Sequence, residues 1–131
     1  MKIFERSSKK GWGNRLNIVD KNNVVVGYDY NQGCCEDFGY LFTTNIENIH
    51  KTNNYLSIKE SCDFEHEDYV FDTNFYENVS FEKHDGAAAI FKLVAKEKKP
   101  VYLVLYNYHN GYYSHGFKMK KEGNKIHKGY I

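Results

Sequence analysis

The chain has 131 residues, enough for one hydrophobic core, and its 18 basic and 17 acidic residues give a net charge of +1. This balance lacks the basic excess typical of nucleic-acid-binding domains of this size, so a nucleic-acid partner is not expected. No stretch reaches the roughly 18 apolar residues of a membrane span. The N-terminal segment MKIFERSSKKGWGN also lacks the apolar run of a secretory signal.

These features predict a single domain over residues 1–131 in the cytoplasm, with no membrane association. The three cysteines, an odd number, fit a reducing compartment better than a disulfide framework. Tyrosine is abundant, with twelve copies. Tyrosine favours strands and interfaces, because its ring buries well while its hydroxyl tolerates water.

Strand-like runs appear from the N-terminal third onward. RLNIVD (15–20) and NVVVGYDY (23–30) flank Asn22-Asn23 and predict a hairpin. GYLFTTNI (39–46) and FYENVSFE (75–82) indicate further strands.

The segment 45–68 has partly helical spacing, with Ile46, Ile49 and Leu56 as its apolar positions. Its asparagine-rich middle favours a helix of only two or three turns.

The C-terminal third contains three strand-like runs, at residues 87–95, 101–109 and 112–120. KEKK separates the first two, and Asn110-Gly111 separates the last two. Asn-Gly between apolar-rich runs is a strong hairpin signal, because a type I′ turn needs positive φ at both central residues. A fourth run, KIHKGYI, follows a turn at Gly123-Asn124. We therefore expect an α+β fold that is mainly antiparallel β, with five to seven strands, a C-terminal meander and one short helix.

A two-residue loop at Asn110-Gly111 places Tyr106 opposite His115 and sorts the side chains onto two faces. The predicted core face contains Tyr102, Val104, Tyr106, Tyr108, Tyr113, His115, Phe117 and Met119. If residues 96–99 form the preceding loop, Leu93 lies beside Tyr102, and small alanines lie beside the tyrosines near the Asn-Gly end. This arrangement predicts either a packed layer of rings or a cleft. His115 is then either a buried imidazole bonded to a tyrosine hydroxyl or a site residue.

The stretch 27–40, GYDYNQGCCEDFGY, places adjacent cysteines directly after a strand. Cys34 and Cys35 can pack as small apolar side chains, form a vicinal disulfide or bind a metal. The acids and histidine of CDFEHEDY, Asp63, Glu65, His66 and Glu67, either ligate a hard metal or form a charged surface loop. We expect no metal and no cofactor.

GYDYNQGCCEDFGY together with YLVLYNYHNGYYSHGF (102–117) resembles a group of small uncharacterised domains that are common in phages and prophages. Those domains pair a Cys-Cys-Glu element with an Asn-Gly-Tyr-Tyr-x-His-Gly hairpin near the end. The resemblance covers these two motifs only. It implies a small accessory protein of a mobile element that acts on host factors, and it places Cys34, Cys35 and Glu36 near the hairpin.

We therefore expect a binding protein without catalysis. It would sequester a host protein or a small polar ligand in the host cytoplasm, as counter-defence proteins do. The expected contact residues are Asn107, Tyr108, His109, Tyr112, Tyr113, His115, Cys35 and Glu36. One alternative is a metal-dependent hydrolase or nuclease that uses His109, His115, Glu36 and a cysteine. A second alternative is a structural homo-oligomer subunit, such as a homodimer formed through an exposed strand edge.

Overall fold

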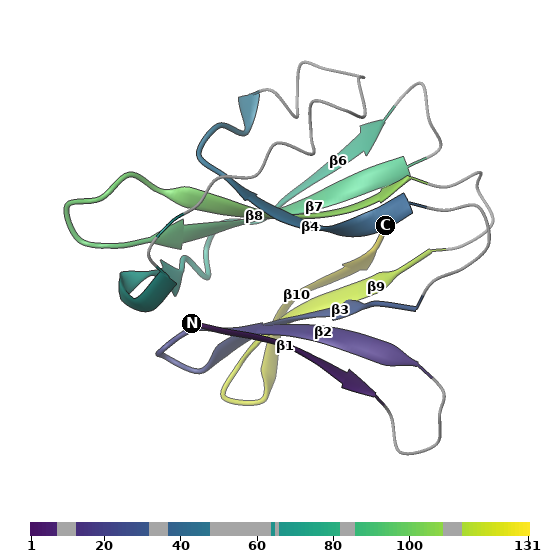
Figure 1. Ribbon diagram of the computed structural model, residues 1–131, viewed down its shortest axis with the longest axis horizontal. Helices are drawn as coiled ribbons and strands as arrows, with labels where there is room; N and C mark the ends of the chain where they lie inside the picture. The colour runs from purple at the N-terminus through teal and green to yellow at the C-terminus, as the bar shows by residue number, and fades with distance from the viewer. Residues whose placement is uncertain (8–12, 32–36, 48–63, 65, 82–85, 109–113) are drawn as a thin grey trace.

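The computed structural model describes residues 1–7, 13–31, 37–47, 64, 66–81, 86–108 and 114–131. These residues form ten β-strands and one 3-10 turn, and Figure 1 shows the strands stacked in two layers. The elements are β1 (Lys2–Ser7), β2 (Asn14–Val19), β3 (Val24–Asp29), β4 (Asp37–Thr43), η1 (His66–Asp68), β5 (Val70–Phe71), β6 (Glu77–Phe81), β7 (Gly86–Val94), β8 (Val101–Tyr108), β9 (Gly116–Lys121) and β10 (Asn124–Tyr130).

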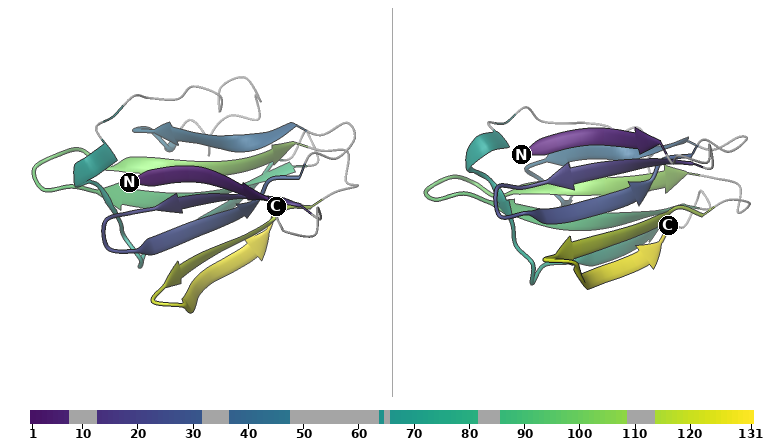
Figure 2. Two further views of the ribbon diagram at one scale, coloured as in Figure 1. Left: turned by 60° about the horizontal axis from the view of Figure 1, so that its bottom comes forward. Right: turned by 90° about the horizontal axis from the view of Figure 1, so that it is seen from below.

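Both sheets are antiparallel. The first sheet has the strand order β1-β2-β3-β9-β10, and the second has the order β4-β8-β7-β5, with β6 also paired to β7. Strands from both ends of the chain therefore share the first sheet. Figure 2 (right) looks onto the outer side of that sheet, where the purple and blue β1 to β3 lie beside the yellow β9 and β10.

The main core lies between the sheets, where alternate residues of each strand point inward. β3 contributes Val26 and Tyr28, and β8 contributes Leu103 and Leu105, all of them buried. The Tyr28 hydroxyl donates a hydrogen bond to the Tyr106 carbonyl oxygen at 2.9 Å and so connects the two layers. A second, smaller apolar cluster lies on the other face of the second sheet and contains Leu41, Ala88, Ile90, Val104 and Tyr108. The central strands β7 and β8 are therefore buried on both faces.

Three predicted hairpins are present: β2–β3, β7–β8 and β9–β10. Asn23 has a φ of 61° in the first of these turns. The last turn lies one residue earlier than expected, at Glu122-Gly123. Both of its residues have positive φ, 52° and 79°, as a type I′ turn requires.

The predicted pairing across Asn110-Gly111 is wrong. β8 pairs with β4 and β7 in the second sheet, whereas β9 pairs with β3 and β10 in the first. The chain thus crosses between layers here, and the expected meander is split into two hairpins. Residues 109–113 lie outside the described residues.

The predicted core face of β8 is buried, but in the smaller cluster and not between the sheets. Val101, Leu103 and Leu105 point between the sheets, while Tyr102 and Val104 belong to the cluster on the outer face. For β9, Phe117 and Met119 point inward as expected.

The predicted β7–β8 register is displaced by one residue. Leu93 pairs with Val101 rather than with Tyr102. The connecting turn includes Glu97 in the left-handed conformation, with a φ of 59°. A shift of one residue moves every side chain to the opposite face.

The expectation of a mainly antiparallel β fold is confirmed, although the strand number exceeds the predicted five to seven. Most of the expected helix within 45–68 falls on residues 48–63 and 65, outside the described residues. The 3-10 turn η1 lies at its end. Within the described ranges, no helix is long and apolar enough to cross a membrane.

Candidate functional site

The structure describes three of the eight expected contact residues, and all three are buried. Asn107 is 0% exposed, His115 2% and Tyr108 8%. Side chains this enclosed present little surface to a partner. The other five, His109, Tyr112, Tyr113, Cys35 and Glu36, lie outside the described residues.

Asn107 and His115 come together at the end of the chain, in the core. Nδ2 of Asn107 donates to the Ile131 carbonyl oxygen at 3.1 Å, and the backbone N–H of His115 donates to the same oxygen at 2.6 Å. Nδ1 of His115 lies 2.7 Å from the Asp29 carbonyl oxygen, and because a carbonyl only accepts, Nδ1 carries the proton. The imidazole also stacks on Phe38, with ring centres 4.3 Å apart.

Most of the residues that the sequence suggested as metal ligands lie outside the described residues. Of the suggested ligands, the structure places His66 and Glu67 in η1 and His115 in the core. Within the described ranges, no three His, Cys, Asp or Glu side chains are grouped closely enough to hold an ion.

A different feature stands out on the outer face of the first sheet. The strand registers align Arg6 with Arg15, and Lys118 with Lys128, across neighbouring strands. Side chains two residues apart on a strand share a face, so this face also includes Lys2, Lys120 and Lys125. Asp29 pairs with Arg15 and is the acidic residue on this face among the described strand positions.

Part of this face forms an open groove with a volume of about 1050 Å³. Its basic lining residues are Arg6, Arg15, Lys118, Lys125 and Lys128. The remaining lining residues are Ser7, Gly13, Asn14, Asn17, Asp29, Asn31, Ser114, Gly116, Phe117, Gly129 and Tyr130. We call this groove the basic groove. It draws on strands from both ends of the sequence.

Gly27 lies at the middle of the sheet, buried beneath the Arg15 side chain. Nη2 of Arg15 lies 4.0 Å from the position that a Cβ of Gly27 would occupy, so the guanidinium reaches across β3 toward β9. Gly27 pairs with Lys118 on β9. The arginine and the lysine therefore meet over a glycine.

Electrostatic repulsion within the groove follows from this crowding. Arg15 is the main cause that lowers the pKa of Lys118 below the ordinary lysine value, followed by desolvation and then by Lys120 and Lys125. In the described part of the chain, the ion pair seen is Lys98 with Asp68, far from this face. Five cations gathered around the single described carboxylate of Asp29 leave an excess of positive charge, which attracts anions.

One end of the basic groove carries a hydrogen-bonded polar network. Nδ2 of Asn31 donates to Oδ1 of Asp29 at 2.6 Å, and Oδ1 of Asn31 accepts from the Asn14 backbone N–H at 2.7 Å. The Ser7 hydroxyl in turn donates to Oδ1 of Asn14 at 3.1 Å. These contacts hold Asp29 against Asn31 and fix the ends of β1, β2 and β3.

Two aromatic side chains flank this face on opposite edge strands. Tyr130 on β10 is 76% exposed, and Phe4 on β1 is 45% exposed. They are the exposed large hydrophobic side chains among the described residues. The Tyr130 ring lies over Gly116, with Cε1 3.3 Å from the position of a Cβ there. The absence of a side chain at Gly116 lets the ring lie close to the sheet.

Comparisons with protein-family models, curated proteins and solved structures found no match to this chain. The basic groove therefore has to be interpreted from its own geometry.

Sequence reasoning missed the basic groove, although part of its signal was present. Lys118 and Lys120 alternate with apolar residues on one strand, which places both on the outer face. Arg6 and Arg15 lie more than a hundred residues away in sequence, and nothing local indicates that β3 pairs with β9. The net charge of +1 conceals the cluster, because it sums over the whole surface.

Proposed function

We propose that this protein is a non-catalytic binding protein that captures an anionic ligand in the basic groove. The observation that carries the proposal is the convergence of five basic side chains on a groove whose described lining residues include one carboxylate, that of Asp29. Complementary charge concentrates an oppositely charged ligand and accelerates its association.

Binding without chemistry is supported by the kinds of side chain that line the groove. They are cations, amides, hydroxyls and glycines, with no histidine or cysteine among the lining residues that the structure describes. Asp29, the carboxylate of the set, is held by the Asn31 side chain. A general base hydrogen-bonded to a nucleophile is the minimal arrangement for nucleophilic catalysis, and no such hydrogen bond is seen between Asp29 and a serine hydroxyl in the described part of the lining.

The resemblance to phage and prophage domains supplies a context for this proposal. A mobile-element protein of this kind would sequester a host component, either a host protein or a small polar ligand. The positive charge of the groove indicates that the ligand, or the partner surface that contacts it, is anionic. The proposal therefore restricts the possible partners to molecules with an anionic binding surface.

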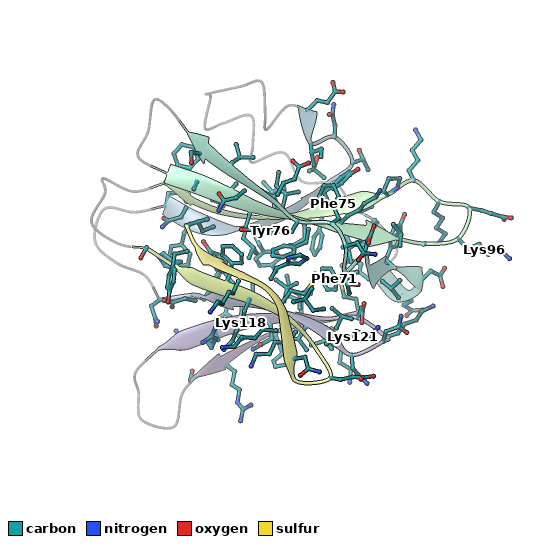
Figure 3. The ribbon with its side chains drawn as sticks, turned by 180° about the vertical axis from the view of Figure 1, so that it is seen from behind. Phe71, Phe75, Tyr76, Lys96, Lys118 and Lys121 are labelled. Carbon is teal, nitrogen blue, oxygen red and sulfur yellow. The ribbon has the colours of Figure 1, made fainter. Side chains whose placement is uncertain are left out.

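A heparin column tests the proposal, because heparin is a polyanion and the eluting salt concentration reports electrostatic affinity. The groove variant carries Arg15→Gln, Lys118→Gln and Lys128→Gln. The matched control carries Lys21→Gln, Lys96→Gln and Lys99→Gln, which removes the same charge from exposed positions outside the groove lining. Figure 3 shows Lys96 at one end of the molecule, away from Lys118.

We expect the groove variant to elute at clearly lower salt than the control variant, which should elute close to the unmodified protein. Equal elution of the two variants would contradict the proposal, because it would show that only the net charge matters.

A further inference from the structure

We infer that the anionic ligand of the basic groove is a single strand of nucleic acid, DNA or RNA. This inference rests on the proposed function and names the ligand class for the same site. It draws on a second set of observations, the exposed aromatic rings and the span of the face, which charge alone does not explain.

The exposed aromatic rings favour a ligand that has unpaired bases. Large apolar side chains are normally buried, yet the two exposed ones in the described residues are both aromatic and both lie on the basic face. Tyr130 lines the groove directly, with Cε1 and Cδ1 of its ring nearest to Gly116, and the residue is 76% exposed. An exposed ring beside cations is the arrangement on which unpaired bases stack while their phosphates are neutralised. Binding of an acidic protein surface would require the basic side chains but would not require exposed aromatic rings.

The span of the basic face fits a short strand. Because Gly27 and Gly116 have no side chains, the Arg15 guanidinium and the Tyr130 ring lie close to the sheet. Four inter-strand spacings separate β1 from β10, so Phe4 and Tyr130 lie roughly 20 Å apart across the sheet. A short oligonucleotide spans that width. The amides of Asn14, Asn17 and Asn31 offer hydrogen bonds along its path.

The shape of the groove favours a single strand over a duplex as the ligand. Reading of a duplex uses an element that enters a groove of the nucleic acid, usually a helix or a protruding two-stranded ribbon. Here the basic side chains line a groove on the protein. Such a groove can accommodate a single strand, but it cannot insert into a groove of a duplex. The expectation that nucleic acid is not a partner rested on the net charge alone. Because the cations are concentrated on one face, the net charge does not argue against a nucleic-acid ligand.

The test is fluorescence anisotropy with four probes: labelled dT12, labelled rU12, a labelled 12-base-pair duplex and labelled inorganic polyphosphate of similar charge. The variants are Tyr130→Ala, Tyr130→Phe, the groove variant and the control variant defined above. Thermal unfolding of each variant confirms that it is folded. Comparison of dT12 with rU12 shows which nucleic acid is preferred.

We expect dT12 or rU12 to bind more tightly than polyphosphate and the duplex. Tyr130→Ala should weaken binding of the single strand about 5- to 150-fold and leave polyphosphate binding unchanged, because polyphosphate has no base to stack. Tyr130→Phe should retain the affinity. With five phosphate contacts, the slope of log K against log salt should be about −3.5, and in the groove variant, which keeps two, about −1.4.

Two results would overturn the inference while leaving the proposed function intact. One is that polyphosphate binds as tightly as the single strands and Tyr130→Ala has no effect, which would define a plain anion site. The other is that the duplex binds more tightly than dT12 and rU12. If the groove variant and the control variant bind every probe equally, the proposed function fails as well.

Discussion

The carboxylate of Asp20 joins the two sheets by accepting a hydrogen bond from the backbone N–H of Phe71 at 2.8 Å. Its other oxygen accepts from the N–H groups of Asn22 and Val24, both at 2.9 Å. Asp20 is 4% exposed. One buried side chain therefore shapes the β2–β3 turn and attaches it to β5 in the opposite layer.

Asp20→Asn should lower the free energy of unfolding by about 1.5–3 kcal/mol, because the amide supplies one acceptor where the fold uses two oxygens. Urea unfolding measures this loss. Asp72→Asn is the matched control, since Oδ1 of Asp72 accepts from the Asn74 N–H in an exposed turn and asparagine keeps that acceptor. We expect the control to change stability by less than about 0.5 kcal/mol. Equal losses in the two variants would contradict the structural role of Asp20.

His115→Ala should cost about 2–4 kcal/mol of folding free energy, because it removes the stack on Phe38 and the hydrogen bond to the Asp29 carbonyl. Ser114→Ala, at the exposed neighbouring position, should cost little. Denaturant unfolding compares the two variants. A His115→Ala protein that keeps its stability but loses heparin retention would instead make His115 a binding residue, as the sequence suggested.

Ligand binding should weaken at alkaline pH because of Lys118. Its pKa is lowered, chiefly by Arg15, so Lys118 loses its charge at a lower pH than an ordinary lysine. Binding of dT12 by the unmodified protein should therefore fall as the pH rises toward that lowered pKa. Lys118→Arg should keep its charge over the same range. Anisotropy titrations between about pH 7 and 10 compare the two proteins, and superimposable pH profiles would exclude Lys118 as the titrating group.

The same repulsion sets how the stability of the free protein depends on pH. A lysine whose pKa is lower in the folded state than in the unfolded state opposes folding while both states are charged. That opposition is relieved as the pH rises from the lowered pKa to the unfolded value of 10.5. Added salt should relieve it at neutral pH by screening. Thermal unfolding in 50 and 300 mM NaCl should therefore show a smaller gain for Lys118→Gln than for the unmodified protein.

Gly27→Val should separate binding from stability. A Cβ at residue 27 would lie 3.6 Å from Oδ1 of Asn17, an ordinary contact, and valine favours strands more than glycine does. The unfolding midpoint should be unchanged or higher. Affinity for dT12 should fall, because the new side chain displaces the Arg15 guanidinium, which lines the groove. Val25→Ile adds bulk to the same face of the same strand, two residues from Gly27, and should leave affinity unchanged. Loss of binding in both variants would contradict this role of the Arg15 guanidinium.

The sequence by itself determined the local structure. Alternating apolar residues and turn signals predicted the β2–β3 and β9–β10 hairpins, because both depend on residues close together in the chain. The class of fold followed from the same pattern. A strand with one buried face, such as β9, shows this face by alternation, and Phe117 and Met119 were predicted correctly.

Only the tertiary structure decided which strands pair and which faces meet. β8 is buried on both faces, so its alternation carries no information about which side faces the other sheet. The Asn-Gly signal suggested a local partner for β8, but pairing with β4 and β7 replaces it. The basic groove likewise depends on which strands pair in the tertiary structure. Arg15 and Lys118 meet because β3 pairs with both β2 and β9, and that long-range pairing is set by the burial of the two sheets against each other.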